Sequence, residues 1–405
     1  MAAIRRVLMR GGTSKAVFLK EADLPTDLAE RDRLILRIFG SPDRRQIDGL
    51  GGADPLTSKL AIIGPVRQDE PRAAGTHLTY TFGQVEIGHP EIDYLSLCGN
   101  ISSSVGAFAI YEGLVEPRAP VTTVRVYNTN LNRVLTIKVP VSGNRPREAG
   151  DYVVPGVPGT GARILIDFAD TAGGATGALL PTGNPLDPLD IPGFGRIDAS
   201  LVDIGNAHVF IRARDVGLAG TETAAQIDAN APLRGLLERI RAAAAVRVGM
   251  ISTAGASREE SPATPILGMI SPPADYEDVL NRRTVRAAEV DVVGRVMFMQ
   301  QMHKTYAGTS TVCTGVASRV PGTVVHEAAR SEAGAGRNAA EVRIGHPAGV
   351  IETEADVRLE GNHYVVRRAT LGADGAPDPG RLRLHAGGGG APPRMSAIPK
   401  PRSVG

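Results

Sequence analysis

Glycine and proline interrupt this chain so often that only short regular elements fit between them. There are 48 glycines and 29 prolines among its 405 residues. Both residue types favour turns and are disfavoured inside helices and strands. The runs between them are apolar or alternate apolar with polar residues, which is typical of strands. The expected strands are residues 60–63, 77–82, 124–127, 134–139, 163–168, 201–204, 209–212, 246–251, 289–293 and 341–344.

Helical periodicity is less frequent in this sequence. One helix is expected over residues 27–39, with Thr26 as its N-cap, and another over 232–245, which starts on a proline. Two shorter helices are expected directly after the two cysteines, over 99–113 and 314–319. Many strands with a few helices, in both halves of the chain, predict an α+β fold.

The length of the chain favours two domains over a single core. The stretch 180–188 is rich in proline and is the best candidate linker. We therefore expect an N-terminal lobe over 1–185 and a C-terminal lobe over 186–370. Residues 371–405 are rich in glycine and proline and are expected to form a disordered tail. Each half holds one cysteine followed by small and polar residues, which points to two similar lobes.

The charge balance gives no reason to expect nucleic acid or a membrane surface as a partner. Lysine plus arginine number 45 and aspartate plus glutamate 43, a formal net charge of +2, and the basic residues are scattered. Two cysteines cannot form a disulfide framework, so a reducing, cytoplasmic environment is expected. The first residues lack the apolar core of a signal peptide, and no stretch reaches the ~18 apolar residues that span a bilayer.

Familiar cofactor and metal signatures are incomplete in this sequence. Residues 11–15 lack the spacing of a phosphate-binding loop, and 49–54 and 156–161 do not complete the dinucleotide-binding pattern. The histidines never pair at metal-ligand spacing. We therefore expect a reaction that needs neither a metal nor a cofactor.

Both cysteines, Cys98 and Cys313, stand at expected helix starts. There the helix dipole and the free N–H groups stabilise a thiolate, and they bind carboxylates or the enolate-like charge of a deprotonated carbon acid. Each thiol could serve as base, as acid or as a small polar wall, and the alternative is a buried, inert cysteine. The residues that would contact such an anion next to the thiols are Gly99, Asn100, Thr314 and Gly315.

Lys59 ends a glycine-rich turn and begins the apolar run 60–63. Burial there would lower its pKa and make a neutral amine base plausible, although a surface lysine at a strand edge is the alternative. The turn that holds Ser14 offers hydroxyls and N–H groups to a carboxylate, unless it is an ordinary tight turn. Asn128 and Asn206 lie near strand ends, where they could contact a substrate or simply form turns.

Taken together, these segments resemble the PrpF family of isomerases, within the diaminopimelate-epimerase-like superfamily. The resemblance runs in order from about Arg6 to about Thr370 and is most specific over 41–59. The matching segments are residues 9–15, 41–59, 98–100, 128–130, 203–206 and 345–349.

The resemblance implies two similar lobes, each a set of strands around a central helix, with the active site between them. It implies that Lys59 and Cys98 transfer protons without a cofactor and that the Ser14 hydroxyl contacts the substrate. Residues 313–315 also look like the second cysteine motif of amino-acid epimerases, in which two thiols face each other across the substrate. Cys313 is therefore expected to be either catalytic or part of an anion-binding helix start.

Family substrates are unsaturated polycarboxylates: 2-methylaconitate, methylitaconate, aconitate and 4-oxalomesaconate. The stretch 41–49 looks most like the 4-oxalomesaconate tautomerases, whereas the serines at 102–104 depart from that subgroup. The resemblance implies an allylic proton shift or a cis–trans isomerisation of a small polycarboxylate, and a homodimer is possible. The alternatives are a two-thiol epimerase or racemase and a small-acid binding protein without activity.

The C-terminal end departs from the resemblance. After residues 368–372 such proteins continue with an arginine-rich helix and a closing Gly-Tyr-Val-Tyr strand, which this chain lacks. If residues 373–387 are back-translated with GC-rich codons and the reading frame is shifted by one base, the result can encode the missing segment. A frameshift is therefore one hypothesis, and an ordinary divergent tail is the other. A missing strand would expose a sheet edge and reduce stability.

Overall fold

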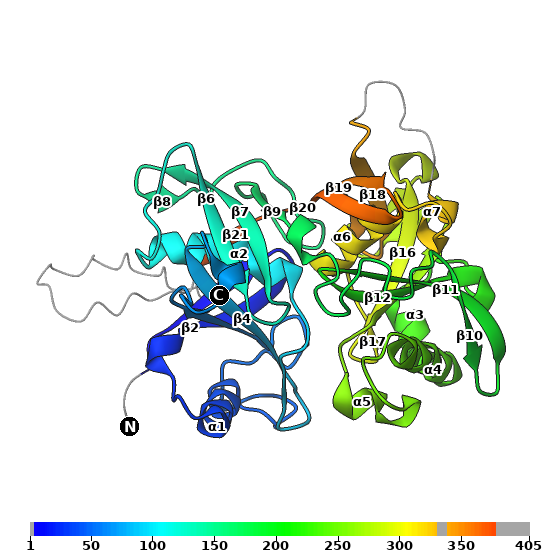
Figure 1. Ribbon diagram of the computed structural model, residues 1–405, viewed down its shortest axis with the longest axis horizontal. Coiled ribbons are helices and arrows are strands. Elements are labelled where there is room, and N and C mark those ends of the chain that lie inside the picture. Colours follow the sequence, from blue (N-terminus) through cyan, green and yellow to red (C-terminus); the bar gives the residue numbers. More distant parts are fainter. Residues whose placement is uncertain (1–3, 330–337, 378–405) are drawn as a thin grey trace, which may run out of the picture.

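The computed structural model describes residues 4–329 and 338–377. Figure 1 shows two lobes side by side, one built mainly from the N-terminal half of the chain and the other mainly from the C-terminal half. In each lobe, strands surround one buried helix, as expected for the α+β fold. The expected division between 185 and 186 falls in the connection from β9 (Ile164–Asp167) to β10 (Asp187–Ile191).

In the N-terminal lobe, a continuous series of paired strands wraps around α2 (Gly99–Tyr111). Besides β9, its strands are β1 (Arg6–Gly11), β2 (Ser14–Lys20), β3 (Lys59–Gly64), β4 (Leu78–Val85), β5 (Ile92–Asp93), β6 (Val121–Asn128), β7 (Arg133–Ser142), β8 (Arg145–Pro146), the last residues of β20 (His363–Ala373), and β21 (Gly375–Pro377). The series runs β21–β1–β2–β3–β4–β6–β7–β9–β20, and only β2–β3 and β4–β6 are parallel.

Helix α2 is buried along almost its whole length, from Gly99 to Ile110. Its polar residues are accommodated because their hydroxyls bond to backbone carbonyls. Ser102 donates to the carbonyl of Cys98 (2.9 Å), Ser103 to that of Asn100 (2.7 Å) and Ser104 to that of Arg10 (2.6 Å). The three serines that depart from the oxalomesaconate subgroup therefore serve the fold.

The C-terminal lobe repeats the plan around α6 (Gly308–Ala317), every residue of which is buried. Besides β10, its strands are β11 (Gly195–Ile204), β12 (Asn206–Arg212), β13 (Ile266–Ser271), β14 (Tyr276–Asp278), β15 (Arg283–Val285), β16 (Val292–Phe298), β17 (Gln301–Met302), β18 (Glu341–His346), β19 (Gly349–Glu360) and most of β20. The series runs β10–β11–β12–β13–β16–β18–β19–β20, and only β12–β13 and β16–β18 are parallel.

Strand β20 belongs to both lobes (Figure 1). It pairs with β19 in the C-terminal lobe, and its last four residues pair with β9 in the N-terminal lobe. Strand β21 then pairs with β1, and Asp374 forms a two-armed ion pair with Arg10 (2.5 and 2.6 Å). The chain therefore returns to its first lobe at the end of the described residues.

The prediction that the tail begins at residue 371 is wrong for residues 371–377. Leu371 and Ala373 are buried, because the end of β20, where residues 369–373 are all buried, pairs with β9. Strand β21 covers the edge of β1. The rest of the expected tail, 378–405, lies outside the described residues, as does most of the segment on which the frameshift hypothesis rests.

The remaining helices lie on the outside of the lobes: α1 (Leu28–Phe39) on the first, and α3 (Ala224–Ala229), α4 (Ala231–Arg247), α5 (Ser257–Glu260) and α7 (Val324–Ala328) on the second (Figure 1). The N-cap of α1 is Asp27 instead of Thr26, because its carboxylate accepts from the N–H of Glu30 at 2.8 Å. Burial on α1 is confined to one side, where Ile35 and Phe39 reach the core.

Nine of the ten expected strands overlap an observed strand. The exception is 246–251, where α4 continues to Arg247 and Gly249 then turns the chain with φ +72°. The alanine run 242–245 explains the difference, since alanine favours helix continuation more than the following alternation favours a strand. The hairpins β1–β2 and β19–β20 were not expected.

Candidate active site

The two central helices begin at a common point between the lobes. Gly99 opens α2 and Gly308 opens α6, and the two glycines pack against each other. A Cβ added to Gly99 would lie 2.8 Å from the carbonyl carbon of Gly308, so no side chain fits there. The N-caps, Cys98 and Ala307, provide no side-chain hydrogen bond. The N–H groups of both first turns are therefore available to an anion.

A narrow cleft lies in front of these helix starts. Its free volume is about 20 Å³, room for about one water molecule. The N-terminal lobe contributes Ser14, Lys59, Phe82, Leu97, Cys98, Gly99 and Asn100, and the C-terminal lobe contributes Asn206, Ile266, Phe298, His303, Ala307, Gly308 and Thr309. The cleft thus combines two helix starts, one lysine, one thiol and an apolar wall.

Lys59 is the first residue of β3 and is 3% exposed. Its Nζ lies 5.3 Å from the centre of the Phe82 ring and 5.4 Å from that of Phe298, and it donates to Oε1 of Gln84 at 2.6 Å. Burial lowers the pKa of Lys59, and the neighbouring Cys98 acts in the opposite direction. The expected buried lysine at a strand start is present.

The glycine-rich turn before Lys59 is held by close packing. A Cβ on Gly49 would lie 2.2 Å from the carbonyl carbon of Phe39. The buried side chain of Gln46 accepts from the N–H of Ala53 (2.9 Å) and donates to Ser58 Oγ (2.8 Å). This packing fixes the turn that leads into Lys59.

Ser14 and Asn100 extend the site on the N-terminal side. The hydroxyl of Ser14 is buried and has no hydrogen-bond partner among the described residues, so it is free to bind a ligand in the cleft. Asn100 Nδ2 donates to Thr13 Oγ1 at 3.0 Å, which fixes the turn between β1 and β2 to the start of α2. Cys98 is half-buried and lines the same cleft as these groups and Lys59.

Asn206 joins the lobes behind the cleft. Its Oδ1 accepts from the N–H of Leu97 (2.8 Å), and its Nδ2 donates to the carbonyl of Leu97 (2.8 Å) and to Thr309 Oγ1 (3.1 Å). It lines the cleft as expected and also fixes the segment before Cys98 against α6. Asn128 does not line the cleft: it bonds to Tyr80, Asn130 and Leu131 and shapes the turn after β6.

The expected helix start at Cys313 is wrong. Helix α6 begins at Gly308, so Cys313, Thr314 and Gly315 lie within the helix and away from the cleft. The thiol of Cys313 donates to the carbonyl of Val202 at 3.6 Å, and burial raises its pKa well above the ordinary value. Cys313 is thus a core thiol, and the position that corresponds to Cys98 is occupied by Ala307.

His303 lines the cleft and was not among the residues expected there. It is 8% exposed, and burial together with the charge of Lys59 lowers its pKa to about 4. Its sequence context, directly after the two-residue strand β17, gave no signal for a site. Only the position of the β16–β17 hairpin across from Lys59 brings it into the cleft.

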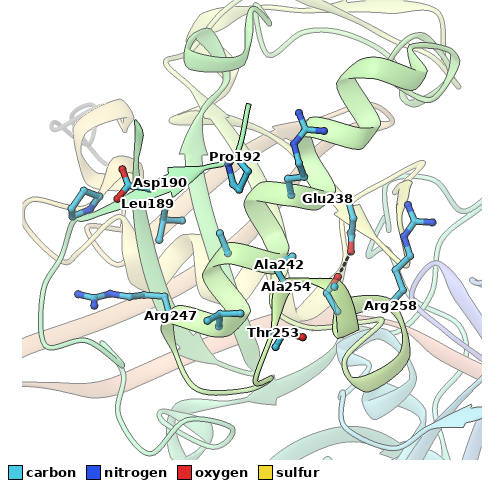
Figure 2. A pocket seen from close by; sticks show the side chains of 15 residues that line it. Leu189, Asp190, Pro192, Glu238, Ala242, Arg247, Thr253, Ala254 and Arg258 are labelled. Atoms are coloured by element: carbon cyan, nitrogen blue, oxygen red, sulfur yellow. Dashed lines mark hydrogen bonds between the residues drawn. The ribbon is translucent and has the colours of Figure 1, made fainter. Parts of the chain in front are cut away.

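A larger hollow of about 740 Å³ lies elsewhere on the C-terminal lobe, between α4, β10 and α5 (Figure 2). It shares no lining residue with the cleft. Glu238 is already bonded to Arg241 and Ser257, and Arg247 to Asp187. Arg247 and Arg258 lie on opposite sides of this hollow (Figure 2). The two side chains are therefore not placed to bind one anion together.

The two-lobed fold of this chain is also found among solved structures of low sequence identity. A hydroxyproline epimerase from Agrobacterium vitis shows the same fold, with a TM-score of 0.52 at 11% identity over 93% of this chain and 90% of that one. The diaminopimelate-epimerase-like fold expected from the sequence is thereby confirmed.

The PrpF protein family matches residues 1–373, and the chain belongs to this family of isomerases. It is 49% identical to the 3-methylitaconate isomerase of Eubacterium barkeri over 87% of this chain and 90% of that protein. It is 37% identical to the (4E)-oxalomesaconate Delta-isomerase of Novosphingobium sp. (strain KA1), over 90% of this chain and 92% of that protein. A crystal structure of a methylitaconate-delta-isomerase superimposes with a TM-score of 0.76 at 47% identity, covering 93% of each chain.

Within residues 4–329 and 338–377, no helix has the length and apolar character needed to cross a membrane. The same residues hold no cluster of three or more histidine, cysteine or acidic side chains suited to a metal ion. Independence from metal and cofactor stays a prediction.

Proposed function

We propose that this isomerase moves a proton along the allylic system of a small unsaturated dicarboxylate of the methylitaconate type. The observation that carries the proposal is one buried lysine beside a thiol, facing two helix starts in a cleft that is partly lined by apolar side chains. Removing a proton next to a carboxylate needs a neutral base and a place for the charge that develops, and these groups supply both.

The proposed reaction of 3-methylitaconate conserves all its atoms. Neutral Lys59 removes the proton from the carbon that bears the methyl group and a carboxylate. The electron pair moves through the neighbouring double bond to give a dienolate. A proton then adds to the terminal methylene carbon, from Lys59 or from Cys98, and the product is 2,3-dimethylmaleate. The lysine thus begins and ends the cycle in the same state if it returns the proton itself.

The lining residues favour a dicarboxylate over a more highly charged substrate. No arginine is among the described residues that line the cleft, and Lys59 is its only cationic side chain. Two helix starts, with Ser14 and Thr309 beside them, match two carboxylates. The apolar side chains of Phe82, Phe298 and Ile266 suit methyl groups, whereas the third carboxylate of oxalomesaconate would lack a charged partner in the cleft.

A two-thiol epimerase is not supported, because Ala307 occupies the place opposite Cys98 and carries no acid or base. Substitution of Cys98 by serine distinguishes the source of the returned proton. If Cys98 is the acid, turnover falls more than about a hundredfold. If Lys59 returns the proton, turnover falls much less.

The test follows proton movement by NMR in deuterated water with 3-methylitaconate, 2-methylaconitate and 4-oxalomesaconate. We expect methylitaconate to be consumed fastest, with deuterium appearing in a methyl group of the product. In Lys59→Gln turnover should be lost while the melting temperature stays within a few degrees. Lys138→Gln, an exposed lysine on β7, is the matched control and should behave as wild type.

Three results would decide against the proposal. Near-normal turnover in Lys59→Gln removes the lysine from the mechanism. Faster turnover of oxalomesaconate removes the dicarboxylate preference. Binding of 2,3-dimethylmaleate without any proton exchange would make the chain a binding protein. A cytoplasmic location and a homodimer are separate proposals, tested by cell fractionation and by analytical ultracentrifugation.

A further inference from the structure

Lys59 belongs to a row of three buried residues that runs across neighbouring strands. Lys59 on β3 pairs with Gln84 on β4, and Gln84 in turn pairs with Asp93 on β5. Residues that are directly paired in antiparallel strands present their side chains on the same face of the sheet. The three residues are 3%, 1% and 8% exposed in that order. The amide of Gln84 therefore stands between a buried amine and a buried carboxyl group.

The hydrogen bonds of Gln84 fix which end of its amide faces the lysine. Nε2 donates to the carbonyl of Ser58 at 3.0 Å and to that of Pro55 at 3.2 Å. Because a carbonyl oxygen can only accept, the amide nitrogen lies on that side and Oε1 lies on the other. Oε1 accepts from Lys59 Nζ at 2.6 Å. The amine is thus held by an acceptor that cannot turn away without leaving two carbonyls unpaired.

The carboxyl group of Asp93 is bonded to its own end of the row. Its Oδ2 accepts from Ser96 Oγ at 2.6 Å, and its Oδ1 accepts from the N–H of Leu95 at 3.1 Å. Burial raises the pKa of Asp93, and these bonds act in the opposite direction. A carboxylate in direct contact with Lys59 would stabilise its charged form and raise its pKa. Gln84 occupies the position from which such a contact would be made.

We propose that Gln84 is the positioning residue of Lys59: its uncharged amide oxygen fixes Nζ at the cleft and keeps Asp93 from forming an ion pair with it. This proposal rests on the proposed function of the same cleft. A neutral amine has two N–H bonds and one lone pair, and the N–H donated to Gln84 limits the directions in which the lone pair can point. Such alignment of a base with its substrate contributes to the rate of proton removal.

Gln84→Glu tests the need for an uncharged acceptor, because it keeps the length of the side chain and adds a charge beside the lysine. The titratable groups that already face the amine are retained in this variant; they are Cys98, Asp54, Asp93 and His303. The new carboxylate should raise the pKa of Lys59 by at least about 1. Since the base must be neutral, kcat/KM at pH values below this pKa should fall at least about tenfold and should recover at higher pH.

Gln84→Met removes the acceptor without adding a charge. An accepting oxygen stabilises the ammonium form, so its loss should lower the pKa of Lys59 below that of wild type. The amine is also no longer held, so kcat should fall at least about tenfold at every pH. A general loss of packing would lower the rate in both variants, but it would not change the pKa in opposite directions.

The pKa of Lys59 can be measured without turnover by NMR titration of protein labelled with 13C-lysine. The chain has six lysines, and the Lys59 signal is the one that Lys59→Gln lacks. Gln46→Glu is the matched control: Gln46 is 2% exposed and bonds to Ser58, the neighbour of Lys59. It adds a carboxylate to the same turn without this bond to the amine, so the pKa of Lys59 should change by less than about half as much as in Gln84→Glu.

The titration separates this inference from the proposed reaction. If the wild-type enzyme turns over none of the three test acids, the proposed function fails, and the lysine titrations alone decide for or against the role of Gln84. An unchanged pKa of Lys59 in Gln84→Glu, equal changes in the two glutamate variants, or a wild-type kcat in Gln84→Met would overturn the proposal. If Gln84→Glu does not fold, Gln84→Met decides, and a pKa of Lys59 that is unchanged or raised there contradicts it.

Discussion

Burial of Lys59 destabilises the folded protein by an amount that depends on pH. Its ordinary pKa of 10.5 is lowered in the fold, first by burial, while Cys98 opposes the shift. Between the folded and the unfolded pKa, the unfolded chain holds a proton that the folded chain lacks. Protonation therefore stabilises the unfolded chain, and the stability of the fold rises with pH up to about 10.5.

Substitution of Lys59 by methionine should remove this cost together with activity. Methionine fits between the rings of Phe82 and Phe298, although Gln84 Oε1 loses its donor. We measure the free energy of unfolding in urea for the variant and for wild type. The value for the variant minus the value for wild type should be larger at pH 7 than at pH 9.5. Terms that do not depend on pH cancel in that comparison. The control Lys138→Met, at an exposed lysine, should show no such dependence on pH. If Lys59→Met shows none either, the pKa of the Lys59 amine is not lowered in the fold.

At the scale of residues, sequence reasoning identified the N-terminal half of the site better than the other half. Cys98 and Ser14 stand close to glycines and Lys59 ends a glycine-rich turn, and such patterns are visible along the chain. His303 and Ala307 have no such signal, since an isolated histidine after a short strand and an alanine are ordinary residues. Cys313 was chosen because a rare residue attracts attention, and only packing shows that it lies in the core.

At the scale of elements, the start of α6 could not be read from the sequence. Its N-cap is an alanine, which offers no side-chain bond, and Thr309–Thr311 have modest helix propensity. The helix forms because the C-terminal lobe surrounds it completely, and this stabilisation comes from contacts distant in sequence. By contrast, Asp27 capping α1 and the proline near the start of α4 are local signals, and those helices were expected correctly to within a few residues.

The contact between the two helix starts yields a prediction at the same scale. In Gly308→Ala the new Cβ would lie 2.8 Å from Leu371 Cδ2 and 3.0 Å from the N atom of Asn100, so the helix ends must separate. We expect kcat/KM to fall at least about tenfold, since small displacements of aligned groups are costly in catalysis. Steady-state kinetics with methylitaconate measures this effect.

Gly235→Ala on α4 is the matched control for that substitution. The nearest atom to its new Cβ is Arg239 Nη1 at 3.8 Å. It should raise the free energy of unfolding by about 0.5–1 kcal/mol, because alanine favours the helix, and leave kcat/KM unchanged. Normal kinetics in Gly308→Ala would show that the separation of the helix starts is not critical.

At the scale of the whole molecule, the cleft must open for a substrate to enter. Its free volume of about 20 Å³ holds no dicarboxylate. The lobes are joined by β20 on one side (Figure 1), and an ion pair between Lys304 and Asp54, 2.5 Å from Nζ to Oδ2, spans them beside the cleft. This pair must break whenever the lobes separate, and it links the turn before Lys59 to the residue after His303.

Lys304→Met should therefore favour the open form and weaken substrate binding. The pair is partly exposed, with 69% of the Lys304 side chain and 28% of that of Asp54 accessible, so its contribution is at most about 1 kcal/mol, or about fivefold in KM. Salt screens such pairs, and the KM of wild type should approach that of the variant at about 1 M salt. As a control, Arg358→Met removes an exposed pair with Asp356 on β19. It should leave KM unchanged both at low salt and at high salt. Equal KM values for wild type and Lys304→Met at low salt would show that the ion pair does not hold the lobes together, and closure would then rest on the contacts of Asn206 and of the two helix starts.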